Sequence, residues 1–346
     1  MAQFHKLTIK EIKRETNDAV SIAFDIPEKL ASEFKYIAGQ YITIKKELEG
    51  KELRRAYSIC SDPESKELKV AIKAVEGGAF SVFATKLLKE GDKLEVSIPE
   101  GRFILKPQPS KNYIAIAAGS GITPVMSMLK ASLHNDSTFT LIYGNKTPKD
   151  TIFKERLDVL KKMYATRLNV HYIFSQEQDK EALFGRCDKG NINYFLKNEY
   201  KNTTFDEAFL CGPESMIKTA TEVLISNNIE KENIHFELFS VPVEANENNQ
   251  IPDGNSEITI ILDDEQTTFI MPQKKIILNA ALDKDLDAPY SCQGGVCSSC
   301  LARVTEGKVT MEKNAILTDS EIEEGLILTC QAHPITSKII VDFDDV

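Results

Sequence analysis

The part of the sequence that most narrows the fold is Ser291-Cys292-Gln293-Gly294-Gly295-Val296-Cys297-Ser298-Ser299-Cys300. It places three cysteines at the spacing C-x4-C-x2-C, and Cys330 supplies a fourth thiol further along the chain. Thiolates at this spacing, three on one loop and one on a distant strand, hold the two irons of a [2Fe–2S] cluster. Gly294 and Gly295 permit positive φ angles and let backbone N–H groups approach the cluster sulfides. We therefore predict one [2Fe–2S] cluster with the ligands Cys292, Cys297, Cys300 and Cys330.

A structural zinc site is the alternative, because four thiolates also bind zinc. Zinc sites usually combine two C-x2-C pairs, whereas only Cys297 and Cys300 form such a pair here. The seven cysteines also favour metal ligation in a reducing compartment over disulfides, since four of them crowd into the last fifth of the chain. Cys60, Cys187 and Cys211 are isolated.

The cysteine segment 291–300, together with Leu328-Thr329-Cys330, resembles plant-type ferredoxins. This resemblance implies a β-grasp-like α+β domain at the end of the chain. The sequence departs from the pattern at Gln293, where many of these proteins carry a basic residue. The departure bears on reduction potential or docking and leaves the ligand set intact.

Upstream of this domain, hydrophobic patterns indicate two further folds. Residues 20–26, 68–72 and 94–98 alternate apolar and polar side chains between Pro and Gly punctuation, which is typical of a small antiparallel β-barrel. The continuous apolar run 113–118 instead begins a series of strands alternating with helices, which indicates a doubly wound α/β domain. A helix should begin near Pro124 and bury Val125, Met128, Leu129 and Leu133.

The polar stretch 240–256 has no apolar periodicity and is typical of a linker. We therefore predict a flavin-binding barrel over 1–106, an NAD(P)-binding domain over 107–239, this linker, and a ferredoxin domain over 257–346.

The end of the first α/β strand carries a loop suited to a dinucleotide, Gly119-Ser120-Gly121-Ile122-Thr123-Pro124. Glycines let a phosphate approach the backbone, and the following helix offers N–H donors and positive potential. Cys211-Gly212-Pro213 ends a later strand of the same domain, so it should lie at the same sheet edge. The GxGxxP form resembles the ferredoxin–NADP reductase superfamily, which implies that Cys211 lies beside the nicotinamide. The alternative for Cys211 is a small buried residue without a chemical role.

Two patterns in the barrel match the flavin site of that superfamily in order and spacing. They are Arg55-Ala56-Tyr57-Ser58 and Gly77-Gly78-Ala79-Phe80-Ser81. The resemblance implies that Arg55 binds flavin phosphate, Tyr57 packs on the flavin ring and Ser58 lies near its reactive edge. It also implies that the glycine turn and Ser81 hold the pyrophosphate. An edge-strand arginine and a core tyrosine are the alternative reading.

Near the end of the α/β domain, Glu237 and Phe239 match the acidic and aromatic positions of the family at the flavin–nicotinamide contact. The alternative is an exposed glutamate and a core phenylalanine. Coenzyme choice stays open between NADPH and NADH. Ser175 is not followed by the arginine that many NADPH-using relatives carry, but Arg186 can still supply a cation for a 2′-phosphate.

The order of the three modules resembles reductase components of bacterial oxygenases, among them the reductase subunits of ring-1,2-phenylacetyl-CoA epoxidases. That resemblance implies FAD, whereas phthalate-dioxygenase-type reductases share the order and use FMN, so both flavins stay open. It also implies an oxygenase component as the electron acceptor. Rival interpretations are a flavin/iron–sulfur redox sensor and a docking protein built on a degenerate reductase.

Charge and hydropathy limit the partners and location. The net charge of −10 argues against sequence-independent nucleic-acid binding, which needs a basic surface. The first sixteen residues lack the apolar core of a secretory signal, and the run 113–122 is too short to span a bilayer. We therefore expect a cytoplasmic protein without a membrane partner.

Overall fold

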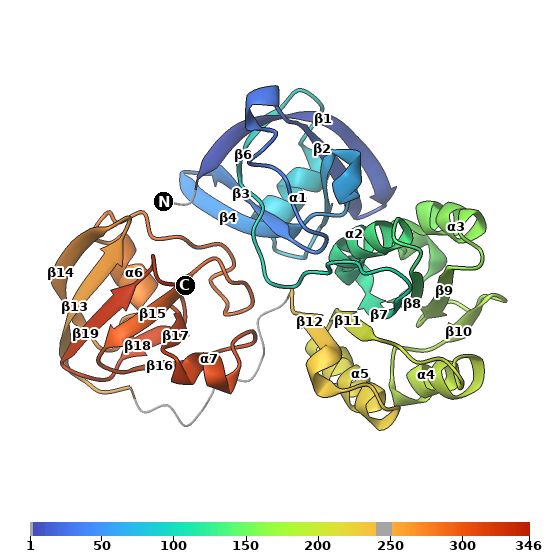
Figure 1. Ribbon diagram of the computed structural model, residues 1–346. Coiled ribbons are helices and arrows are strands. Elements are labelled where there is room, and N and C mark those ends of the chain that lie inside the picture. The colour runs from blue at the N-terminus through green and yellow to red at the C-terminus, as the bar shows by residue number, and fades with distance from the viewer. Residues whose placement is uncertain (1–2, 240–250) are drawn as a thin grey trace. The chain divides into compact units, whose positions relative to one another are not determined.

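The computed structural model describes residues 3–239 and 251–346, which form two compact units (Figure 1). One unit contains His5–Leu53 and Tyr57–Phe239. The other contains residues 251–346 together with the short segments 3–4 and 54–56. In the part of the chain that is described, no helix has the length and apolar character needed to cross a membrane.

The N-terminal part is a six-stranded antiparallel barrel, as predicted. Its strand order is β4-β3-β6-β1-β2-β5, and a bridge between Ile59 and Val70 joins the end of β4 to β5. The strands are β1 (Phe4–Thr16), β2 (Ala19–Asp25), β3 (Tyr41–Leu48), β4 (Lys51–Ser58), β5 (Leu68–Lys73) and β6 (Lys93–Ser97). Helix α1 (Ala79–Lys86) buries Phe80 and Ala84 in the barrel core. The apolar residues predicted in β2 and β5 are buried.

The following part is a doubly wound domain with a six-stranded parallel sheet, again as predicted. Its order is β10-β9-β8-β7-β11-β12. The strands are β7 (Asn112–Ala118), β8 (Thr138–Asn145), β9 (Leu168–Phe174), β10 (Ala182–Phe184), β11 (Glu207–Cys211) and β12 (Ile234–Glu237). Helices α2 (Ile122–Leu133) and α3 (Lys154–Met163) lie on one face, and α4 (Lys189–Tyr194) and α5 (Glu214–Ser226) on the other (Figure 1).

The strand order reverses between β7 and β11, because the chain runs outward through β8, β9 and β10 before it returns. Ligands of such sheets bind at the carboxyl ends of the strands at this reversal. Helix α2 begins there, and it buries the four apolar residues predicted for it. It begins at Ile122, so Pro124 is its third residue and still lies in the first turn, where a missing N–H is tolerated.

The C-terminal unit is an α+β domain with a five-stranded mixed sheet in the order β14-β13-β19-β15-β17. Its sheet strands are β13 (Asn255–Leu262), β14 (Glu265–Pro272), β15 (Leu301–Glu306), β17 (Leu326–Leu328) and β19 (Lys338–Asp342). Strands β16 (Val309–Met311) and β18 (Ala332–Pro334) form a separate pair, and the helices are α6 (Ile277–Leu282) and α7 (Asp319–Glu323).

The predicted linker 240–256 lies largely outside the described residues, which resume at 251. Its last two residues belong to β13, because Asn255 and Ser256 pair with Pro272 and Met271 of β14.

Candidate functional site

The glycines after β7 have different surroundings, and both suit a dinucleotide loop. Residues Gly119–Gly121 form a 3-10 turn between β7 and α2. Gly119 has a φ of +54°, and a Cβ atom built there would meet no atom within 4 Å. A Cβ at Gly121 would stand 2.1 Å from the carbonyl oxygen of Cys211. Gly121 therefore lets the loop pack on the end of β11, while Gly119 leaves room for a ligand.

Helix α2 offers the N-terminus that an anion needs. It has 12 residues, and no side chain among the described residues caps its first turn. Thr123 Oγ1 donates to the Ser120 carbonyl at 3.1 Å, which ties the helix to the loop before it. Backbone N–H groups of such a turn and the helix dipole favour a phosphate. The loop therefore fits the pyrophosphate of a nicotinamide dinucleotide.

The Cys211-Gly212-Pro213 end of β11 lies directly across from this loop. Cys211 pairs with Ala117 of β7 on one side and with Glu237 of β12 on the other. The side chain is fully buried, and desolvation, reinforced by Glu237 when that group is ionised, raises the pKa of its thiol. The thiol is therefore protonated at neutral pH and can contribute shape and packing but no thiolate nucleophile. Pro213 precedes α5 at its N-cap position.

Ser58 and Glu237 bring the barrel and the α/β domain together. Ser58 ends β4, Glu237 ends β12, and the Ser58 hydroxyl donates to Glu237 Oε2 at 3.3 Å. Glu237 as a whole residue is partly exposed, but its carboxyl group is enclosed. This burial raises the pKa of Glu237 to about 8, against the opposing effect of the hydrogen bond from Ser58. The carboxyl group is thus largely protonated at neutral pH. Perturbed pKa values of this kind cluster at functional sites.

Phe239 follows this pair, and its side chain is 41% exposed. The alternative of a core phenylalanine and an exposed glutamate is therefore wrong, because Phe239 is exposed and the carboxyl group of Glu237 is enclosed. An exposed aromatic ring two residues from an enclosed carboxyl group is suited to contact with a flat ligand.

The predicted flavin residues of β4 occupy positions with different exposure. Ser58 is buried, Ala56 and Tyr57 are half-buried, and Arg55 is exposed. The Tyr57 ring packs on Phe80 of α1 with the ring centroids 5.8 Å apart, so the barrel supports it from one side. The Arg55 guanidinium donates to the Arg54 carbonyl at 2.7 Å. The strand therefore presents a supported ring and an accessible cation, as a flavin phosphate and ring require.

The turn at Gly77 and Gly78 leads into α1. Gly77 has a φ of +72° with open space around a would-be Cβ, and Gly78 is the N-cap residue. A Cβ at Gly78 would stand 2.4 Å from Ser81 Oγ. The Ser81 hydroxyl also accepts from the Val75 N–H at 3.2 Å. Ser81 is thus committed to closing the turn, which leaves backbone N–H groups as the donors toward an anion.

The residues predicted to select the coenzyme lie after β9. The Ser175 N–H donates to the Asn145 carbonyl at 3.0 Å, and Arg186 is exposed on the loop before α4. These contacts leave NADH and NADPH open.

In the C-terminal unit, the cysteine loop brings two predicted ligands together. The Sγ atoms of Cys292 and Cys297 are 3.0 Å apart. Gly294 donates its N–H to Cys292 Sγ at 3.3 Å, as expected for a loop that wraps a cluster. Positive φ angles occur at Gln293 (+53°) and Gly295 (+72°), and Gly294 is not among these residues. Both glycines permit a positive φ, and Gly295 is the one that adopts it.

Cys297, Cys300 and Cys330 are buried, and the carbonyl of Cys300 accepts from the N–H and hydroxyl of Thr329. Ser291 Oγ is buried and finds no hydrogen-bond partner within the described residues. A buried donor without a partner beside the first cysteine fits a loop that closes on sulfide acceptors. Among the described residues, no set of three or more His, Cys, Asp or Glu side chains is arranged to hold a single metal ion.

Gln331 is a residue of this loop system that the sequence interpretation missed. Its Nε2 donates to the carbonyls of Gln293 and Cys330, at 3.0 and 2.9 Å. Because both acceptors are carbonyl oxygens, only the amide nitrogen can satisfy them. Gln331 therefore clips the tip of the cysteine loop to the fourth cysteine. Its position directly after Cys330 was the available signal.

Three family models match the chain in the predicted order. The oxidoreductase FAD-binding domain matches residues 6–104, the oxidoreductase NAD-binding domain 115–222, and the 2Fe-2S iron-sulfur cluster binding domain 260–334. These matches confirm the flavin, nicotinamide and cluster domains, and they support FAD over FMN and a cluster over zinc.

Relatives extend over nearly the full length. The E subunit of 1,2-phenylacetyl-CoA epoxidase from Escherichia coli (strain K12) is 39% identical over 99% of both chains. The ferredoxin reductase component of 3-ketosteroid-9-alpha-monooxygenase from Rhodococcus rhodochrous is 33% identical over 97% of this chain and 96% of that protein. The solved structure of phthalate dioxygenase reductase has the same fold, with a TM-score of 0.61, 23% identity and 98% of both chains covered. The chain belongs to the family of oxygenase reductase components whose three domains bind FAD, a nicotinamide dinucleotide and a [2Fe–2S] cluster.

Proposed function

We propose that the protein is the cytoplasmic reductase component of an oxygenase of the 1,2-phenylacetyl-CoA epoxidase type. The observation that carries this proposal is the 39% identity to the E subunit of that enzyme over 99% of both chains. The bound flavin and [2Fe–2S] cluster would let the two electrons of a hydride donor be passed on singly to the oxygenase. The domain boundaries 1–106, 107–239, 240–256 and 257–346 belong to the proposal, and the three matched ranges support them.

In this proposal the chain's residues bind and orient the groups. The flavin would be held by Arg55, Ala56, Tyr57 and Ser58 with the turn at Gly77 and Gly78, whose shape the Ser81 hydroxyl fixes. The dinucleotide would be held by Gly119, Ser120, Gly121, Thr123, Pro124, Ser175, Arg186, Cys211, Gly212 and Pro213. The four ligand cysteines 292, 297, 300 and 330 would hold the cluster.

Four residues form the proposed reaction centre: Ser58, Cys211, Glu237 and Phe239. Ser58 and Glu237 share a hydrogen bond across the two domains, so they fix the spacing between the flavin and nicotinamide positions. A carboxyl group with a pKa of about 8 can exchange a proton near neutral pH. The Cys211 side chain is fully buried and would act through packing, whereas the Phe239 side chain is 41% exposed and would contact a flat ligand directly.

A second candidate partner is an oxygenase such as 3-ketosteroid-9-alpha-monooxygenase, whose reductase component is 33% identical. Reconstitution separates the two. The protein, with NADH or NADPH, is mixed with the oxygenase component of one system or the other, and product is counted per coenzyme oxidised. We expect tight coupling with the phenylacetyl-CoA epoxidase components. Uncoupled coenzyme oxidation with them, and product with the steroid system, would contradict the proposal.

A further inference from the structure

The Tyr143 hydroxyl lies at the base of the dinucleotide loop. Tyr143, near the carboxyl end of β8, is fully buried, and its hydroxyl donates to the carbonyl of Gly119 at 2.9 Å. The Ile152 carbonyl lies 3.4 Å from the same hydroxyl. Burial raises the pKa of Tyr143, so the hydroxyl keeps the proton that it donates.

Gly119 has more conformational freedom than any other residue type, so a contact from outside the loop restricts its peptide. Its φ of +54° is a left-handed conformation, and its surroundings are open on the Cβ side. The loop that follows is held by Thr123 at Ser120 and by Gly121 against Cys211. At the first peptide after β7, the Gly119 carbonyl accepts the Ile122 N–H within the 3-10 turn and the Tyr143 hydroxyl from outside the loop.

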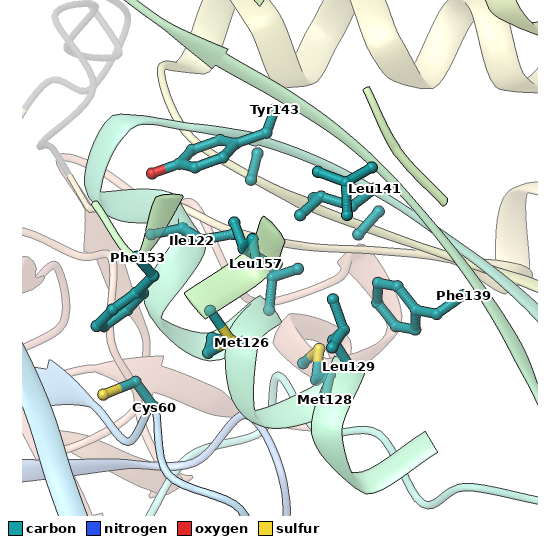
Figure 2. Close-up of a cluster of buried hydrophobic side chains, with 14 of the residues drawn as sticks. Cys60, Ile122, Met126, Met128, Leu129, Phe139, Leu141, Tyr143, Phe153 and Leu157 are labelled. Atoms are coloured by element: carbon teal, nitrogen blue, oxygen red, sulfur yellow. The ribbon is translucent and has the colours of Figure 1, made fainter. Parts of the chain in front are cut away.

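The second neighbour of the hydroxyl is also conformationally unusual. Ile152 precedes Phe153, which has a φ of +62° although it carries a bulky side chain. Such a residue is held in place only by its surroundings. Ile152 and Phe153 are buried in the same apolar cluster as Tyr143 and Ile122, the first residue of α2 (Figure 2).

We propose that Tyr143 is a positioning residue for nicotinamide dinucleotide binding, because its hydroxyl locks the Gly119 peptide and couples the loop to the turn at Ile152 and Phe153. This inference rests on the proposed role of the loop at 119–124. The aromatic ring contributes packing, and the hydroxyl sets the direction of the loop.

The test is Tyr143→Phe, with Tyr113→Phe as the matched control. Tyr113 is also fully buried, it lies on the neighbouring strand β7, and its hydroxyl accepts from the Gln108 N–H at 3.0 Å, away from the loop. Binding of NAD+ and NADP+ to the flavin-loaded protein is measured by calorimetry, with thermal unfolding in parallel. We expect both variants to lose similar stability, but only Tyr143→Phe to raise Kd, by about three- to tenfold. An unchanged Kd in Tyr143→Phe, or an equal increase of Kd in both variants, would overturn the proposal.

Amide hydrogen exchange on the unaltered protein is a second test, which does not require that the variant folds. Saturating NAD+ or NADP+ should slow amide exchange in residues 119–123 and also in 151–154. Protection of the loop alone would overturn the coupling through Tyr143. No protection of the loop would instead refute its proposed role in dinucleotide binding.

Discussion

Replacing Gly121 with alanine tests the geometry of the dinucleotide loop. The new Cβ would stand 2.1 Å from the carbonyl oxygen of Cys211 and 2.5 Å from its carbonyl carbon. Both are backbone atoms of a central strand, so no side-chain rotation can relieve the overlap. The loop or the end of β11 must move, and overpacking of this kind costs about 1–3 kcal/mol.

A displaced loop also moves the first-turn N–H groups of α2 away from the phosphate. We therefore expect Gly121→Ala to lower the thermal stability of the protein and to weaken dinucleotide binding by about tenfold or more, which corresponds to about 1.4 kcal/mol. Calorimetric titration with NAD+ and NADP+ measures the second effect.

Gly190→Ala is the matched control for this substitution. Gly190 lies in α4 of the same domain, and its new Cβ would approach one atom, the Asp188 oxygen that caps this helix, at 3.3 Å. This contact needs a shift of only a few tenths of an ångström and touches no part of the dinucleotide loop, so affinity for the dinucleotide should not fall. If Gly121→Ala bound the dinucleotide within about twofold of the unaltered protein, with Gly190→Ala behaving the same, the close-approach argument would be refuted.

Three further predictions concern the reaction centre, the cluster loop and docking. Because the pKa of Glu237 in the folded protein is about 8, above its ordinary value of 4.5, folding keeps a proton that the unfolded chain releases. Stability should therefore fall as pH rises from about 5 to about 8, and Glu237→Gln should make the melting temperature less dependent on pH in this range. The same pH dependence in the variant and the unaltered protein would contradict the raised pKa of Glu237. Gln331→Leu leaves the Gln293 and Cys330 carbonyls without the donor that Gln331 supplies. The visible absorbance of the cluster should therefore decay faster in the variant than in the unaltered protein on mild heating, while the flavin absorbance is retained. Equal decay of the cluster absorbance in the two proteins would contradict this role of Gln331. Residues 251–346 hold 17 acidic and 7 basic residues, so they carry a net charge of −10, equal to that of the whole chain. If this charge attracts the oxygenase, the rate of oxygenase reduction should fall as salt increases, while the rate of flavin reduction by the coenzyme should not. Equal salt effects on both rates would contradict electrostatic docking.

Sequence patterns were sufficient for the fold because each domain has a local signal. Residues 113–117 of the apolar run are buried in a parallel sheet, and the spacing of Cys292, Cys297 and Cys300 belongs to one loop type. Strands such as β3 and β10 lack a clear alternation and were not individually predicted, since their neighbours in the sheet determine them.

The contacts within the sites depended on tertiary structure. Ser58 and Glu237 were each expected from family patterns, but their hydrogen bond joins strands far apart in sequence. The Tyr143 contact with Gly119 and the Gln331 contact with Gln293 have no periodic signature, because a single donor meets a backbone carbonyl in each case. The exposure of Phe239 could not be read from its residue type.

In the function proposed here, the chain passes electrons from a nicotinamide coenzyme through flavin to the cluster. Anaerobic stopped-flow mixing of the loaded protein with NADH, and separately with NADPH, tests it most directly when flavin and cluster absorbance are followed together. We expect rapid bleaching of the flavin followed by bleaching of the cluster, with the faster coenzyme identifying the physiological donor. Flavin bleaching with a cluster that stays oxidised, or no bleaching with either coenzyme, would contradict it.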